Sequence, residues 1–196
     1  MKKQFLFILC TLFTMTSIYA QTISFGAKIG GNLATFDGEN ANSDLKNIDS
    51  KFGLNFGAVA TIKLSDAFSI QPELFYSAQG YKRDFEGFEY KAMIDYFHLP
   101  VLMDLKVFEG LSLQAGPQMG INIRKELEID GQEDSGRINV NDFEASAAFG
   151  LQYVFDSNFF VQARYTMGLS EVFLNDTAKS PVFSFSIGFY FDKPID

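Results

Sequence analysis

The sequence predicts an all-β fold, an eight-stranded antiparallel up-and-down β-barrel that spans a membrane. Eight segments alternate apolar and polar residues one by one, which is the period of a β-strand. Their connections alternate between longer loops and tight turns at Ser65, Phe108 and Asp156. The apolar face of each segment is bulky, whereas the polar face is dominated by Gly, Ser, Gln and Asn. Together these observations favour a barrel with a tightly filled polar interior.

Residues 1–20 have the features of a secretory signal peptide. Lys2 and Lys3 precede an apolar run from Phe5 to Phe13, and the small residue Ala20 ends the segment. We therefore expect residues 1–20 to be removed on export. No later segment approaches the ~20 uninterrupted apolar residues of a spanning helix. If the exported chain enters a membrane, it must cross it as strands, because only helices and closed barrels satisfy every backbone group in lipid.

The composition excludes several classes of function. The 196 residues carry a formal net charge of -8 at pH 7 and no concentrated basic patch, so nucleic acid is not an expected partner. The one cysteine, Cys10, lies in the leader, which leaves the mature chain without a disulfide, a thiol nucleophile or a Cys-ligated metal. We expect no cofactor and no metal. Calcium binding by the acidic loops is the alternative, although the sequence Asp130-Gly-Gln-Glu-Asp134 lacks the spacing of a known calcium loop.

Two strands and a long loop come first in the mature chain. Residues 23–34 alternate apolar with small or polar residues, which predicts the first strand. Residues 35–50 are polar, acidic and rich in Asn and Asp, which predicts a loop. Residues 51–64 alternate again and predict the second strand, which ends at the tight turn of Ser65 to Ala67.

The third and fourth strands are expected to form one long hairpin from Phe68 to Phe108, with its tip near Glu86 and Gly87. If Phe85 faces Phe88 across a two-residue turn, the register pairs Ile70, Pro72, Leu74 and Tyr76 with Met103, Val101, Leu99 and Phe97. All eight side chains then point to one face. We expect lipid contact from its central members, which are Leu74, Tyr76, Phe97, Leu99, Val101 and Met103.

The last four strands follow the same alternation. Residues 111–124 predict the fifth strand, and residues 125–141 predict a second long acidic loop. Residues 142–155 and 159–169 predict two strands joined by the tight turn at Asp156. A loop through Asn175 and Asp176 then leads to the last strand, which ends at Phe191.

Alternation alone does not say whether the apolar face points outward or inward. A soluble lipocalin-like barrel would place it inside, around a ligand. We favour the outward, lipid-facing arrangement because small polar residues suit the tight interior of an eight-stranded barrel. Aromatic residues at strand ends, such as Phe68, Phe155 and Phe159, are also typical of interfacial girdles.

Four motifs in order resemble the PorT-like outer-membrane β-barrel family. They are Gln71-Pro-Glu-Leu-Phe-Tyr-Ser77, Phe97-His-Leu-Pro-Val-Leu102, Ala115-Gly-Pro117, and Arg164-Tyr165 followed by Gly168-Leu169. The resemblance spans essentially the whole mature chain and implies an OmpA/OmpX-like eight-stranded barrel. Residues 21–196 would then form one outer-membrane β-barrel domain. One departure is Asp104, where such proteins often carry a lysine.

The resemblance also bears on biogenesis and orientation. The last strand, which is rich in aromatic residues, looks like the C-terminal strand that the barrel-assembly machinery recognises. Short turns lie in the periplasm in bacterial outer-membrane barrels, which would place both termini in the periplasm and the longer loops outside. We expect a monomer in contact with outer-membrane lipid.

Charged residues on the polar face are expected to form a polar network in the lumen. Its predicted members are Lys28, Lys63, Glu73, Asp104, Glu144 and Arg164. Because an isolated buried charge is very costly, these groups need partners, and Glu73 with Arg164 is the expected pair. A structural salt-bridge network is favoured over a proton or ion path, since eight-stranded barrels leave no open channel.

These observations favour a non-enzymatic protein with a structural or surface-interaction role, whose extracellular loops contact an unidentified protein or envelope partner. An accessory outer-membrane component of a protein secretion system is the main alternative, implied by the family resemblance alone. A lipid-modifying enzyme that uses His98 with Ser77 or Asp95 is a further alternative. Strand parity places Asp95 on the face opposite His98, so no catalytic triad is expected.

Overall fold

The computed structural model describes residues 23–34, 49–85, 88–129, 132–134, 141–170 and 181–192. The expected signal peptide, most of the first acidic loop and the loop at Asn175 lie outside these residues. The strands are β1 (Ile23–Ala34), β2 (Asp49–Lys63), β3 (Phe68–Phe85), β4 (Phe88–Phe108), β5 (Leu111–Ile129), β6 (Gln132–Asp134), β7 (Phe143–Val154), β8 (Phe159–Gly168) and β9 (Val182–Tyr190). In this part of the chain, no helix is long and apolar enough to cross a membrane.

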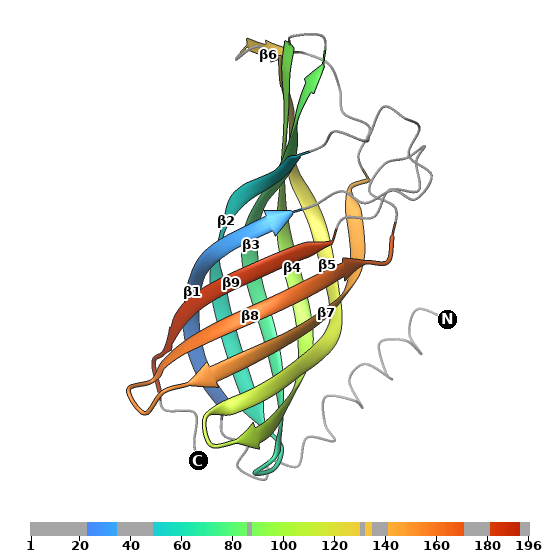
Figure 1. Ribbon diagram of the computed structural model, residues 1–196. Coiled ribbons are helices and arrows are strands. Elements are labelled where there is room, and N and C mark those ends of the chain that lie inside the picture. Colours follow the sequence, from blue (N-terminus) through green and yellow to red (C-terminus); the bar gives the residue numbers. More distant parts are fainter. Residues whose placement is uncertain are drawn as a thin grey trace, which may run out of the picture.

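Eight of these strands close into a barrel (Figure 1). Each pairs antiparallel with its neighbours in the order β4-β3-β2-β1-β9-β8-β7-β5, and pairing of β4 with β5 closes the ring. The short strand β6 pairs with β5 beyond the ring. The predicted fold class, an eight-stranded antiparallel up-and-down barrel, is confirmed.

The shear of the barrel follows from the residue pairs. Starting at Leu33 and stepping once around the ring through paired residues leads back to β1 at Ile23, ten residues away. With a strand rise of about 3.3 Å and a strand spacing of about 4.8 Å, this shear corresponds to a strand tilt of about 41°. Eight strands at this tilt enclose an interior that side chains can fill.

The hairpin of β3 and β4 has the predicted register. Ile70 pairs with Met103, Tyr76 pairs with Phe97, and Phe85 pairs with Phe88 at the tip. The two-residue turn sets this register because a slip of one residue would move every side chain to the other face.

One predicted loop is partly wrong. Residues 125–141 were expected to lack regular structure, but β5 continues to Ile129 and folds back on β6. Tyr90 pairs with Ile129, and Met93 pairs with Glu126. The 21-residue strand β4 presents backbone groups beyond the barrel, and β5 satisfies them by pairing. Figure 1 shows β3, β4 and β5 rising together above the rest of the barrel.

The outer surface is apolar, and the interior is largely polar. Of the hairpin side chains expected to face lipid, Leu74 is 54% exposed and Met103 is 63% exposed. Phe97, Leu99 and Val101 are likewise exposed, and Tyr76 is partly exposed. Buried groups are mainly Gln, Ser, Asn and charged residues, with a small apolar cluster of Val59, Phe160 and Tyr190. A soluble barrel has the opposite distribution, with polar residues outside and apolar residues inside. The observed distribution is the one expected for a barrel surrounded by lipid.

Candidate functional site

The centre of the lumen holds three charged side chains in direct contact. Arg164 of β8 donates from Nη1 to Glu73 Oε2 at 2.7 Å and from Nη2 to Oε1 at 2.6 Å. Lys28 of β1 donates from Nζ to Glu73 Oε2 at 2.6 Å. All three point into the barrel because the alternation of their strands places them on the inner face. They join three strands across the lumen, and their side chains are at most 2% exposed.

This cluster contains two cations and one carboxylate, so neutral polar groups must stabilise the excess positive charge. Lys28 Nζ also donates to Gln162 Oε1 at 3.1 Å and lies 4.3 Å from the centroid of the Phe75 ring. Arg164 Nη2 lies 3.5 Å from Gln114 Oε1. Two amide oxygens and one aromatic face therefore surround the positive charge.

Glutamines extend the central cluster toward the tight-turn end of the barrel. Gln162 Nε2 donates to Gln114 Oε1 at 3.0 Å and lies 3.2 Å from Gln152 Oε1. The Tyr190 hydroxyl donates to Gln71 Oε1 at 3.1 Å and accepts from Gln152 Nε2 at 3.2 Å. Amides both donate and accept, so this layer links strands without adding charge. Sequence reasoning missed the layer, although inward-facing glutamines on four strands were a usable signal.

The predicted polar network is partly continuous in the structure. Lys28, Glu73 and Arg164 are in direct contact, and Asp104 joins them through Gln114. Glu144 and Lys63 have partners outside this cluster. Asp104 accepts from Gln114 Nε2 at 2.8 Å. Glu144 hydrogen-bonds Ser146, and Lys63 pairs with Asp66 at 3.1 Å.

His98 lies in the loop-side half of the lumen and is only 1% exposed. Its Nε2 is 3.2 Å from Gln79 Nε2, and its Nδ1 is 3.2 Å from Gln118 Nε2. The ring also stacks on Tyr96 at a centroid distance of 5.3 Å. The close neighbour Gly120 must lack a side chain, because a Cβ there would lie 2.7 Å from His98 Nδ1.

The structure does not assemble the residues considered for catalysis. Ser77 Oγ accepts hydrogen bonds from Asn32 and Gln79. Asp95 instead hydrogen-bonds Tyr76 on the outer face and lies 3.8 Å from Arg124. Because Asp95 and His98 project from opposite faces of β4, they do not form a base and its orienting carboxylate.

Arg124 also pairs with Glu126 on the part of β5 that extends beyond the barrel. Its hydrogen bond and positive charge lower the pKa of the Glu126 carboxyl. This exposed pair belongs to the rim rather than to the lumen.

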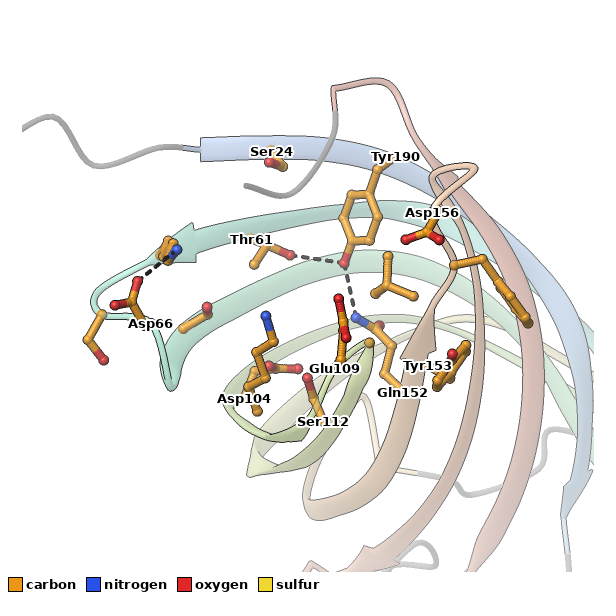
Figure 2. A pocket seen from close by; sticks show the side chains of 17 residues that line it. Ser24, Thr61, Asp66, Asp104, Glu109, Ser112, Gln152, Tyr153, Asp156 and Tyr190 are labelled. Carbon is orange, nitrogen blue, oxygen red and sulfur yellow. Dashed lines mark hydrogen bonds and ion pairs between the residues drawn. The ribbon is translucent and has the colours of Figure 1, made fainter. Parts of the chain in front are cut away.

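A water-accessible cup of about 490 Å³ occupies the tight-turn end of the barrel (Figure 2). Thr61, Gln152 and Tyr190 contribute to its inner end, where the Tyr190 hydroxyl lies 3.0 Å from Thr61 Oγ1. Its wall carries charged residues from three turns and the adjoining strands, namely Lys63, Asp66, Asp104, Lys106, Glu109 and Asp156. Among the residues with described positions, no group of three or more His, Cys, Asp or Glu is arranged to hold a metal ion.

Comparison with protein families matches the outer membrane protein beta-barrel domain over residues 19–174. The chain belongs to this family. Membership in the outer membrane protein beta-barrel domain family agrees with the closed ring, the apolar exterior and the filled polar lumen, and it supports location in the outer membrane. The family match does not single out the PorT-like group.

Solved structures show the same fold as this outer membrane barrel. One is Ail, the attachment invasion locus protein of Yersinia pestis, in complex with the heparin analogue sucrose octasulfate. It is 17% identical, with a TM-score of 0.51, and the match covers 86% of this chain and 99% of Ail. Neisserial surface protein A is 15% identical, with a TM-score of 0.53, over 87% of this chain and 100% of that protein. At these identities the likeness shows the fold alone. No curated protein sequence matches.

Proposed function

We propose that this outer membrane barrel is a non-enzymatic surface-interaction protein. The observation that carries the proposal is the sheet beyond the barrel, hereafter the extended sheet, which comprises residues 80–85, 88–94, 124–129 and 132–134. β3, β4 and β5 contain 18, 21 and 19 residues, whereas β8 and β9 contain 10 and 9. About 9–11 residues suffice to cross the bilayer. The additional residues therefore extend beyond the hydrocarbon layer, where a partner can reach them.

The filled lumen supports the same proposal. Glu73, Arg164 and the glutamine layer occupy the interior with hydrogen-bonded side chains. Eight-stranded barrels of this kind have no open channel, so transport of solutes is not the proposed role. Recognition would then depend on the extended sheet and on the loops at the same end.

In the proposed orientation, the extended sheet lies outside the cell and both termini lie in the periplasm. Support comes from the tight turns at residues 64–67, 109–110 and 155–158, since bacterial outer-membrane barrels have short periplasmic turns. β1 begins and β9 ends at the same end of the barrel as these turns (Figure 1), since Ile23 pairs with Ile62 and the Tyr190 amide donates to the Asn158 carbonyl oxygen. The proposed partners during biogenesis and afterwards are the barrel-assembly machinery and outer-membrane lipid, with the barrel acting as a monomer.

The partner of the extended sheet is proposed to be a protein or another envelope component. Ail was solved with a heparin analogue, which is a dense polyanion. This chain has a formal net charge of -8, so long-range repulsion opposes binding of such a polyanion. The ligand of Ail is therefore not carried over to this protein.

Insertion of an epitope tests the orientation. A tag between Glu86 and Gly87 should bind antibody on intact cells. The matched control is the same tag between Ser65 and Asp66, which should bind antibody only after the outer membrane is permeabilised. Labelling of the control on intact cells, with no labelling at the hairpin tip, would reverse the proposed orientation.

Shortening the hairpin tests the role of the extended sheet. Lys82 and Lys91 are paired, so replacing residues 83–90 with Asn-Gly keeps the register of the barrel strands. Cells with the full protein should bind more immobilised envelope material than cells without it, and cells with the shortened protein should lose this binding. Equal binding by both forms, at equal amounts of folded barrel, or no binding above that of cells without the protein, would contradict the proposal.

The motifs that resemble the PorT-like family support a second candidate, an accessory role in protein secretion. Because the lumen is filled, the barrel would assist a secretion system as a partner rather than conduct its cargo. Deletion of the protein should then reduce secreted cargo. Unchanged secretion together with loss of binding to envelope material would favour the surface-interaction role.

A further inference from the structure

The cup at the tight-turn end is open at the turns and closed at its inner end. The hydrogen-bonded residues Tyr190, Gln152 and Gln71 separate it from the central Lys28 cluster. Its volume of about 490 Å³ is within the range of small-molecule sites, about 300–1,000 Å³. A ligand could therefore enter from the turn end and stop at the Tyr190 layer.

The charged lining of this cup is acidic overall. Asp66, Asp104, Glu109 and Asp156 contribute carboxylates, whereas Lys63 and Lys106 contribute ammonium groups. Lys63 forms an ion pair with Asp66. The remaining carboxylates come from β4, from the β4–β5 turn and from the β7–β8 turn, so they surround the space from different sides. Figure 2 shows Asp104 and Asp156 on different parts of the wall.

Asp104 provides a buried acceptor in this wall. The residue is only 6% exposed. Its described hydrogen-bond partners, Gln114 and Ser112, are neutral donors. Glu73, the buried carboxylate deeper in the same lumen, instead contacts both an ammonium and a guanidinium group. A cation beside Asp104 would offset the cost of burying its charge in the same way.

We propose that the cup binds a small organic cation, or the cationic end of a zwitterion, with its ammonium or guanidinium group against Asp104. The Tyr190 and Thr61 hydroxyls line the inner end, where their oxygen atoms face the bound cation. Glu109 and Asp156 attract the cation at the mouth, whereas Lys106 can contact an anionic group on a zwitterion. In the orientation proposed above, such a ligand comes from the periplasm, but binding itself does not depend on the surface-interaction role.

Putrescine is the probe for this site, and succinate is the anionic control with the same four-carbon chain. Residues 21–196 are refolded in detergent micelles, and backbone amide chemical shifts are followed during titration with each compound. Putrescine should shift amides near Thr61, Asp104 and Gln152 in a saturable manner. Succinate should leave them unchanged.

Asp104→Asn tests the central contact because it keeps the shape of the side chain and removes its charge. Putrescine affinity should fall about tenfold or more, which is the scale of one charge-assisted hydrogen bond. The matched control is Glu144→Gln, the same chemical change at a buried carboxylate in the loop-side half of the lumen. It should leave putrescine affinity unchanged.

A second variant keeps the proposal testable if Asp104→Asn does not fold. Glu109→Gln combined with Asp156→Asn changes only exposed residues of the mouth and should weaken putrescine binding severalfold at low salt. Equal weak shifts with putrescine and succinate would overturn the proposal. Unaltered putrescine affinity in the folded Asp104→Asn protein would overturn it as well.

Discussion

Glu73 is the residue on which the central lumen cluster depends. It accepts two hydrogen bonds from Arg164 and one from Lys28, and its side chain has no exposed surface. Removing the carboxylate would leave two cations close together with no counter-charge. Removing either cation would leave a neutral one-to-one pair.

We therefore predict that Glu73→Gln is more destabilising than Lys28→Met. Glu73→Gln should lower the free energy of unfolding by about 3–5 kcal/mol, the usual cost of breaking a buried ion pair from one side. Urea titration in liposomes, read by gel mobility of the folded band, measures this difference. The order of the two variants is decisive: a larger loss for Lys28→Met would contradict the assigned role of Glu73.

Close packing at Gly188 gives a second prediction at the residue scale. A Cβ at this position would lie 2.2 Å from the Phe160 ring and 2.6 Å from the Ala27 carbonyl oxygen. Gly188→Ala should therefore lower stability by about 1–3 kcal/mol through overpacking. Gly150→Ala is the comparison variant and should cost less stability, because a Cβ there would meet one atom closer than 3.0 Å, the Ala163 carbonyl oxygen at 2.9 Å, and the next atom lies at 3.6 Å. Urea titration in liposomes measures both losses, and a Gly188→Ala barrel as stable as the unaltered protein would contradict the close packing at this position.

Some residue contacts could be predicted from the sequence, and others could not. Parity placed Glu73 and Arg164 on inner faces, and opposite charge then made them natural partners. The contacts of Gln71, Gln114, Gln152 and Gln162 were not predictable in this way, because an amide accepts or donates to many partners equally well. Their choice depends on the shear, which sets the relative height of residues on distant strands.

At the scale of elements, the β3–β4 hairpin was the most predictable part of the chain. Its two-residue turn and long alternation define one register, and the observed pairs Tyr76 with Phe97 and Ile70 with Met103 agree with it. The extension of β5 was missed because residues 125–134 are mostly polar and acidic. Their strand conformation depends on pairing with β4, which lies more than 30 residues away at Tyr90 and Ile129.

This pairing predicts slow amide hydrogen exchange beyond the barrel. Amides in residues 90–94 should all be protected, because β4 pairs with β3 on one side and with β5 on the other. Amides in residues 124–126 should alternate between protected and exchanging, because β5 pairs there with β4 alone. Glu128→Pro removes a backbone donor and should speed exchange around its partner Lys91. The barrel segment near Leu99 and Met119 serves as an internal control and should keep its protection. Rapid exchange throughout residues 124–129 in the unaltered protein would contradict the pairing with β4 and would favour the loop expected from the sequence.

At the scale of the whole molecule, the alternation of eight strands was sufficient to predict the barrel. Composition also indicated which face points outward, since bulky apolar residues could not fit the interior of so small a ring. The biochemical role was less accessible, because fold does not determine function and recognition depends on surfaces rather than on alternation. The cup around Asp104 likewise required the closed ring, which brings three separate turns to one opening.

The closed lumen predicts that the folded protein does not form an open pore. Planar lipid bilayers containing the refolded barrel should show no stepwise conductance at neutral pH. The physical reason is the hydrogen-bonded layer of Glu73, Arg164 and Gln162, which leaves no wide aqueous path through the centre. A porin in the same bilayer is the positive control. Reproducible conductance steps from pure folded protein would be inconsistent with this lumen.

The central claim, that the apolar face of the barrel lies in lipid, is tested most directly by spin-label accessibility along β4. Cys10 is the only cysteine, so residues 21–196 allow single-cysteine labelling at each position from Phe97 to Met103. In liposomes, labels at 97, 99, 101 and 103 should be relaxed by oxygen, which concentrates in lipid, and labels at 98, 100 and 102 should not. High accessibility of the odd-numbered positions to a water-soluble relaxation agent would contradict the claim and would place this face in water.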